Sequence, residues 1–173
     1  MSENYIVREA KLEEYLVLGE LMVEAYEGLE NFPKRDEIPE YYNLLRNVGE
    51  LTKSPKVKLL VAVSSENKVE GGLVYFGDMR FYGAGEEITK EQIAGGFRLL
   101  AVNPKIRGKG LGKLLIEACI EQAKNDGFKH LIIHSTKYMK VAWGMYERIG
   151  FVRFPKIDFE KDGVEVFGFR YTL

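Results

Sequence analysis

The stretch Arg107–Lys113, RGKGLGK, constrains the fold of this chain more than any other. It lies between an apolar run, Phe97–Val102, and an amphipathic run that starts at Leu111. A short apolar run is typical of a buried strand, and apolar residues at helical spacing are typical of an amphipathic helix. The sequence therefore predicts a glycine-rich turn that joins a strand to the N-terminus of a helix.

This turn has the chemistry of a phosphate-binding site. Three glycines at alternate positions let the backbone approach a ligand without Cβ atoms in the way. The helix that follows directs free N–H groups and the positive end of its dipole toward the same point. Four basic side chains surround that point: Lys105, Arg107, Lys109 and Lys113. A solvated basic turn without a ligand would have the same sequence, so the turn alone leaves both interpretations open.

Two familiar phosphate-binding motifs do not fit. A Walker A loop requires G-x-x-x-x-G-K-[ST], whereas Gly108 and Gly112 are one residue too close and Leu114 replaces the hydroxyl residue. A dinucleotide-binding turn requires G-x-G-x-x-G, and Lys113 stands where the third glycine should be. Neither a Walker-type nor a Rossmann-type site is expected.

Two sequence blocks together resemble the GNAT superfamily of acyl-CoA-dependent N-acyltransferases. The first is R-x-x-G-x-G, made of Arg107, Gly110 and Gly112, and it follows the segment Leu99–Pro104. The second is A-x-x-x-Y-x-x-x-G-F over Ala142–Phe151, at the distance expected for an intervening helix and strand. Two blocks in the right order are more specific than either alone. The resemblance covers roughly residues 95–155.

The pattern of elements predicts a mixed α/β or α+β fold. The expected strands are Tyr5–Ala10, Leu59–Ser64, Val69–Gly77, Phe97–Val102, His130–Thr136, Phe151–Phe154 and Val164–Leu173, and the expected helices start near Leu12, Asp36, Leu111 and Lys140. Leu12 and Leu16 are expected on the packed face of the first helix, and Asp78–Ala94 is expected to form an inserted flap. The GNAT resemblance implies a central mixed, mostly antiparallel sheet of about seven strands flanked by about four helices.

Composition limits the partners and the location. The net charge is −1, with 25 basic and 26 acidic residues, so no overall positive field would hold nucleic acid or an anionic membrane. The polar N-terminus does not resemble a signal peptide, and without a long apolar run we expect a cytoplasmic protein. Residues 1–173, with 46% hydrophobic content, are expected to form one domain. Cys119 lies on a predicted apolar helix face, and no metal-ligand cluster is apparent.

The resemblance implies acetyl-CoA as the acyl donor, an amine as the acceptor, no metal, and a monomer or homodimer. The positions it assigns to the cofactor are Leu100, Ala101, Val102, Arg107, Gly108, Lys109, Gly110, Leu111, Gly112, Lys113, Ala142 and Tyr146. The strand segment Leu100–Val102 would offer main-chain N–H and C=O groups to the pantetheine arm. Ala142, one helical turn before Tyr146, would leave room for that arm.

Tyr146 is the candidate catalytic residue. Aminolysis of a thioester expels a thiolate whose thiol has a pKa of about 8.5, whereas a phenol of pKa about 10 is still protonated at neutral pH. A tyrosine can therefore donate the proton, and the family resemblance gives this general-acid role to the Tyr of A-x-x-x-Y. A core tyrosine on a short amphipathic helix is the alternative.

The group that deprotonates the amine is poorly marked. An alkylamine has a pKa of about 10 and is almost wholly protonated at pH 7. The glutamate that many family members carry on the strand before the glycine turn is replaced here by Gly96, and the asparagine that often binds pantetheine is replaced by Met139. The candidates that remain are Glu86, Glu87 and Glu91 in the expected flap and His134 on its strand, although a solvated surface or a satisfied histidine would account for them equally.

Three functions remain open. The first is acetyl transfer to a primary amine, which accounts for the glycine turn, Ala142 and Tyr146 together. The second is a non-catalytic acyl-CoA-binding module, for which the missing glutamate at Gly96 is an argument. The third is a nucleotide-phosphate binder outside the family, which accounts only for the turn. The acceptor itself depends on the segments without motifs: Gly28–Asp36, Asp78–Ala94 and Pro155–Gly163.

Overall fold

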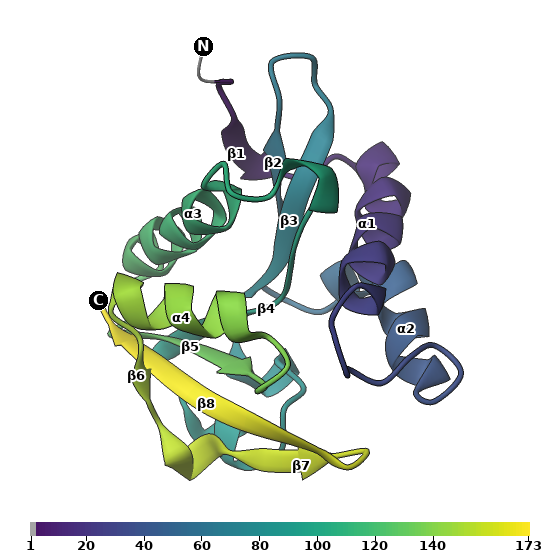
Figure 1. Ribbon diagram of the computed structural model, residues 1–173. Coiled ribbons are helices and arrows are strands. Elements are labelled where there is room, and N and C mark those ends of the chain that lie inside the picture. The colour runs from purple at the N-terminus through teal and green to yellow at the C-terminus, as the bar shows by residue number, and fades with distance from the viewer. Residues whose placement is uncertain (1–2) are drawn as a thin grey trace.

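The computed structural model describes residues 3–173, as one curved sheet with helices on both faces (Figure 1). The strands are β1 (Ile6–Glu9), β2 (Val57–Val63), β3 (Val69–Phe76), β4 (Ala94–Val102), β5 (His130–Ser135), β6 (Val152–Arg153), β7 (Phe159–Lys161) and β8 (Val164–Thr172). The helices are α1 (Tyr15–Glu27), α2 (Pro39–Arg46), α3 (Leu111–Asn125) and α4 (Lys140–Ile149), with short 3-10 turns between elements. Within the described range no helix is long and apolar enough to cross a membrane.

The sheet order is β1-β2-β3-β4-β5-β8-β6, and β7 pairs with β8. Neighbouring strands are antiparallel except β4 and β5, which are parallel. The predicted fold class, a mixed and mostly antiparallel sheet flanked by helices, is confirmed. β7 was not expected, because its three residues lie in the segment Pro155–Gly163, which the sequence pattern predicts to be a loop.

Each face of the sheet has its own hydrophobic core. Helices α1 and α2 cover one face, and α3 and α4 lie against the other (Figure 1). Strands β2 and β3 are buried almost throughout, and the burial of β2 agrees with the apolar run that starts at Leu59. The predicted ends of the later helices are confirmed: Gly127 after α3 and Gly150 after α4 have φ values of 78° and 121°. Cys119 lies on the buried face of α3, as predicted.

The predicted inward face of the first helix was wrong in part. Leu12 lies in a 3-10 turn before α1 and is 78% exposed, and Leu16 is 64% exposed. The buried stripe instead follows Leu18, Met22 and Tyr26, at helical spacing. The change from 3-10 to α-helical winding at Tyr15 rotates the later residues relative to Leu12, so a single helical period across the junction misplaces the face.

The segment Asp78–Ala94 is not a loose flap. It contains two 3-10 turns, and its apolar residues Met79, Tyr82 and Ile88 belong to the buried core that includes α1 and α2, where the Tyr82 ring packs on Phe76 of β3. Ala94, the expected last residue of the flap, is already the first residue of β4. The second helix likewise starts at Pro39 rather than near Asp36, because proline is well suited to the first helical position.

Candidate active site

The sheet opens between its two parallel strands. Strands β4 and β5 pair only where Ala94–Gly96 lies beside His130–Ile132. Further along, β4 carries a bulge: its register with β3 shifts opposite Leu73, and Leu99 has a φ of 61°. A left-handed residue other than glycine costs on the order of 1–3 kcal/mol, so the surrounding packing must hold the bulge in place. The bulge lies where the two strands part.

The opening forms part of a cavity of about 970 Å³. One side of it is formed by the second half of β4, the end of β5, the glycine turn and α4, and the other by α1, α2 and the segment between them. This volume is within the range of sites that bind small molecules and cofactors. The main-chain groups of β4 beyond Gly96 that face β5 have no strand partner and border this space.

The glycine turn forms one end of the cavity. Gly108 and Gly110 have φ values of 83° and 81°, which favour glycine, and a Cβ on either would meet no atom within 4 Å. Gly110 is the N-cap of α3, and its carbonyl accepts the N–H of Leu114 at 3.0 Å. The three N–H groups at the start of α3 therefore have no acceptor in the described part of the helix and point toward the turn.

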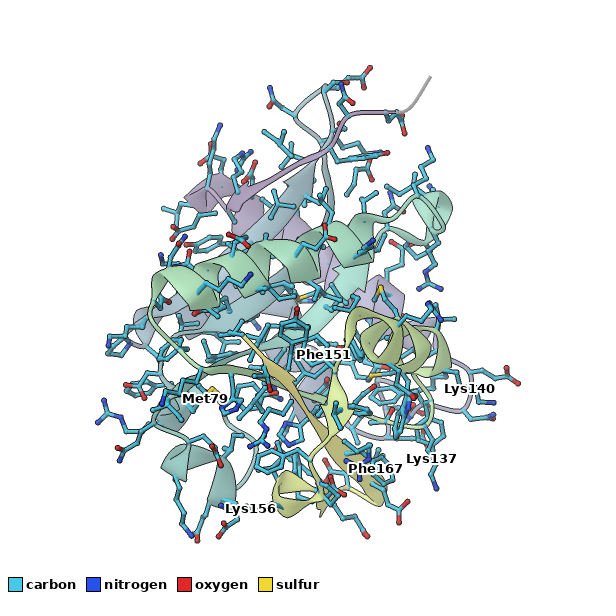
Figure 2. The ribbon with its side chains drawn as sticks, turned by 90° about the vertical axis from the view of Figure 1, so that its left-hand side faces the viewer. Met79, Lys137, Lys140, Phe151, Lys156 and Phe167 are labelled. Atoms are coloured by element: carbon cyan, nitrogen blue, oxygen red, sulfur yellow. The ribbon has the colours of Figure 1, made fainter. Side chains whose placement is uncertain are left out.

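The basic residues of the turn divide into two groups. Arg107 and Lys113 line the cavity, whereas Lys105 and Lys109 do not. The Lys109 ammonium instead lies 2.6 Å from a carboxylate oxygen of Glu3. All the predicted cofactor positions other than Lys109 line the cavity. Two further lysines also border it: Lys137, which precedes α4, and Lys140, the first residue of α4 (Figure 2).

Tyr146 projects from α4 into a group of aromatic rings and borders the cavity. Its ring centroid lies 6.1 Å from that of Phe97, 5.8 Å from that of Phe151 and 6.4 Å from that of Phe169. Burial raises the pKa of Tyr146 well above that of a free phenol. The hydroxyl therefore keeps its proton at neutral pH, and the neighbouring rings hold the tyrosine ring in place.

The structure closes the position where many family members carry a glutamate. Gly96 pairs with Phe76 on one side and Ile132 on the other. A Cβ at Gly96 would lie 2.8 Å from the Ile132 carbonyl oxygen and 2.8 Å from the Tyr82 ring. The acids expected as replacements, Glu86, Glu87 and Glu91, do not line the cavity, and Glu87 pairs with Lys90 at 2.6 Å.

His134 lines the cavity, but both of its ring nitrogens already have partners. Nε2 lies 2.9 Å from the carbonyl oxygen of Ile157, which can only accept, so Nε2 carries the proton. Nδ1 lies 3.1 Å from the Tyr82 hydroxyl and accepts from it in the neutral ring. Burial lowers the pKa of His134 to about 4, so the ring is neutral at pH 7 and a weak base.

Several polar cavity residues were missed from the sequence, and four of them lie deep enough to bear on the chemistry of the site. Arg98, Tyr26 and Tyr41 line the cavity on the side of α1 and α2, and Thr136 lines it at the end of β5. The buried Thr136 Oγ1 has no hydrogen-bond partner within residues 3–173. The sequence held a signal for Arg98, since it is a charged residue inside the apolar run Phe97–Val102. The three others have no such signal, because hydroxyl residues are common in helices and strands.

A parallel strand pair that parts over a cavity, with a glycine turn at a helix N-terminus beside it, is the architecture of an acyl-CoA-dependent acyltransferase domain. Residues 57–173 match the acetyltransferase (GNAT) domain family, which is more than half of the chain. The chain therefore belongs to the GNAT family of acetyltransferases.

Known structures and relatives agree with this assignment. A GNAT-family acetyltransferase from Staphylococcus aureus Mu50 has a TM-score of 0.70 at 15% identity, over 98% of this chain and 99% of that one. The protein yncA of Salmonella typhimurium, solved with its cofactor acetyl-CoA, has a TM-score of 0.63 at 17% identity, over 98% and 94%. At this identity the likeness shows the fold alone.

The relative named Uncharacterized N-acetyltransferase YjgM, from Escherichia coli K12, is 46% identical over 48 residues, which is 28% of this chain and 29% of that protein. The chain spans between 26% and 53% of the length of the curated relatives it matches.

Proposed function

We propose that this chain transfers an acetyl group from acetyl-CoA to a primary amine. The observation that carries the proposal is that the glycine turn and Tyr146 border one cavity at the opening of the sheet. Further support comes from relatives whose names include N-acetyltransferase and from yncA, whose structure contains acetyl-CoA.

The residues present fit acetyl-CoA. The free N–H groups at the start of α3 and the cations Arg107 and Lys113 would bind the diphosphate. The unpaired edge of Leu100–Val102 would bind the amide groups of the pantetheine arm, and Ala142 would leave space for it. Met139, which replaces the usual asparagine, lines the cavity and would give an apolar contact in its place.

Acetyl-CoA supplies the activated thioester carbonyl, and the chain supplies position and a proton. The neutral amine attacks this carbonyl, a C–N bond forms, and the C–S bond breaks. Tyr146 gives its phenolic proton to the sulfur and is reprotonated from solvent, while the nitrogen loses its extra proton to water. Burial raises the pKa of Tyr146, which makes it a weaker acid, and the same desolvation would raise the pKa of the departing thiol.

The variant Tyr146→Phe tests the proposal, because it removes one hydroxyl and leaves the ring. We expect kcat for thiol release with a good amine to drop by about 10²- to 10⁴-fold, the range of a positioned general acid. Stabilisation by CoA should be retained. Tyr171→Phe is the matched control, since the Tyr171 ring packs on Phe151 in the same group of rings but Tyr171 does not line the cavity. Equal single-turnover rates for wild type and Tyr146→Phe would exclude the acid role.

A non-catalytic acyl-CoA-binding module is the second candidate. The closed position at Gly96 and the two occupied nitrogens of His134 favour it, because neither site offers a base for the amine. If the chain is an acetyltransferase without such a base, it must bind the small fraction of the amine that is already deprotonated, and its rate would rise with pH. Thermal stabilisation by CoA, without thiol release over a broad panel of amines between pH 7 and 9, would identify the binding module.

A further inference from the structure

The cavity contains a guanidinium that the protein leaves without a counter-ion. Arg98 projects from β4 into the side of the cavity near α1 and α2. Its Nη1 donates to the Tyr82 carbonyl at 2.8 Å, and this is its one hydrogen bond among residues 3–173. Its Cζ lies 5.7 Å from the centre of the Tyr82 ring. A guanidinium has five N–H donors, so most of those of Arg98 remain free for a ligand.

Other part-buried arginines of the chain are used differently. Arg8 pairs with Glu14 at 2.7 Å, and Arg153 pairs with Asp158 at 2.6 Å. Arg170, outside the cavity, lies over the Phe154 ring at 4.4 Å. Arg98 is part-buried like these, and no described carboxylate lies within ion-pair distance of it. A part-buried cation in a binding cavity without a partner in the protein indicates an anionic group on the ligand.

The surroundings of Arg98 are aromatic. Tyr26, Phe32, Tyr41 and Tyr138 form a group of rings that borders the same cavity, with centroids 5.8–6.1 Å apart. Burial raises the pKa of Tyr26 and Tyr41, and the charge of Arg98 acts in the opposite direction, which places both tyrosines within its field. This side of the cavity therefore combines one cation with an apolar, aromatic wall.

We propose that the acceptor is a free amino acid with an apolar or aromatic side chain, whose carboxylate pairs with Arg98. This inference rests on the proposed function and names its substrate class. The planar guanidinium matches a carboxylate through two parallel hydrogen bonds, and partial burial strengthens them. The side chain would pack on the four rings, and the α-amino group would face the thioester near Tyr146. A simple alkylamine would leave Arg98 unpaired.

The test measures thiol release from acetyl-CoA with three matched sets of acceptors. Each set contains an L-amino acid (phenylalanine, leucine or methionine), its amide, and its decarboxylated amine. Wild type is compared with Arg98→Met, which keeps the length and removes the charge, and with Arg98→Lys, which keeps the charge and removes the fork. Lys161→Met is the matched control, because Lys161 is an exposed cation that also borders the cavity.

We expect wild type to prefer the amino acid over its amide and its amine in at least one set. In Arg98→Met this preference, expressed as a ratio of kcat/KM values, should drop by about 10- to 100-fold, since a hydrogen bond to a charged group contributes about 1.5–3 kcal/mol and 1.4 kcal/mol is tenfold. Arg98→Lys should retain part of it, and Lys161→Met should leave it unchanged. Comparing the ratios between variants cancels the different intrinsic reactivities of the amino acid, its amide and its decarboxylated amine. A purely structural role of Arg98 would lower the rates with all three acceptors equally and leave the ratios unchanged.

The outcomes separate this inference from the proposed function. If wild type acetylates the amides and amines as fast as the amino acids, the carboxylate inference is overturned and acetyl transfer remains intact. A preference for L-phenylalanylglycine over L-phenylalanine would overturn the free amino acid in favour of a peptide N-terminus. If wild type acetylates no amine, acetyl transfer is overturned. Calorimetric binding of N-acetyl-L-phenylalanine in the presence of CoA then decides the site, which stands only if Arg98→Met abolishes binding.

Discussion

The stability of the protein should depend on pH through His134. This residue lies on β5, with its ring centroid 5.5 Å from that of Tyr82 and 5.3 Å from that of Phe159. A second proton on Nδ1 would make the Tyr82 hydroxyl accept from the ring and turn its own hydrogen to the Phe97 carbonyl oxygen, 3.3 Å away. Arg98 and Arg153 oppose the added charge, and Asp158 and the Ile157 carbonyl favour it, but burial is the largest effect and lowers the pKa.

The size of the effect follows from the change in pKa. The pKa of His134 is lowered from 6.5 to about 4 on folding. The unfolded chain therefore takes up this proton first, and stability is lost as the pH falls from about 6.5 to about 4. At 1.36 kcal/mol per pKa unit, the histidine accounts for a loss of about 3 kcal/mol over this interval. Above pH 7 it has no effect, because both states are neutral there.

Urea denaturation between pH 4 and pH 7.5 measures this contribution. We expect the free energy of unfolding to decrease more with falling pH for wild type than for His134→Gln. Over the whole pH range the two losses should differ by about 3 kcal/mol. The control is His130→Gln, which removes the other histidine; its pKa is also lowered, but it is less buried. Parallel curves for wild type and His134→Gln would show that His134 is solvated and titrates normally.

Two further predictions concern the cavity. Gly110→Glu should abolish the thermal stabilisation by CoA, since it adds a carboxylate where the helix N-terminus is expected to bind the diphosphate. Gly85→Glu is the control and should retain the stabilisation. Gly85 also has a positive φ and open surroundings, but it does not line the cavity. Thr136→Val should stabilise the ligand-free protein by about 1 kcal/mol in urea denaturation, because it removes a buried hydroxyl without a partner among the described residues; an unchanged or lower stability would mean that solvent reaches the hydroxyl.

The parts of the site that the sequence predicted lie within continuous motifs. The glycine turn and α4 each hold their candidate site residues within one local element, so the distance along the chain determines the distance in space. Gly108 and Gly110 could be placed in a turn because glycine adopts positive φ values at little cost. The assignment of Tyr146 to a helix closed by Gly150 follows in the same way from a local pattern.

The parts that were missed depend on how distant segments meet. Arg98 reaches the cavity because β4 parts from β5 just beyond Gly96 and bends at Leu99, and neither event is encoded in the strand's own apolar pattern. The segment Asp78–Ala94 lacks both helical and strand periodicity, so its buried residues Tyr82 and Ile88 give no local sign of burial. A charge inside an apolar run was the one available signal for the acceptor side of the cavity.

The substitution Gly96→Glu should not restore the glutamate of other family members; it should unfold the strand pair. The new Cβ would lie 2.8 Å from the Ile132 carbonyl oxygen, 2.8 Å from the Tyr82 ring and 2.9 Å from the Met79 methyl group, in the three-residue ladder that joins β4 to β5. The ladder is too short to yield without separating the strands, and a carboxylate forced into this contact would be desolvated.

We therefore expect Gly96→Ala to lower the free energy of unfolding by about 1–3 kcal/mol and Gly96→Glu to lower it further, without any gain in thiol release near pH 7. Gly95→Ala is the matched control and should cost less, since its Cβ would lie 3.0 Å from the Tyr75 hydroxyl and 3.2 Å from its next neighbours. A stable Gly96→Glu protein with faster thiol release at neutral pH would contradict this reasoning, because it would show that the sheet can accommodate a base at this position and that amine deprotonation limits the rate.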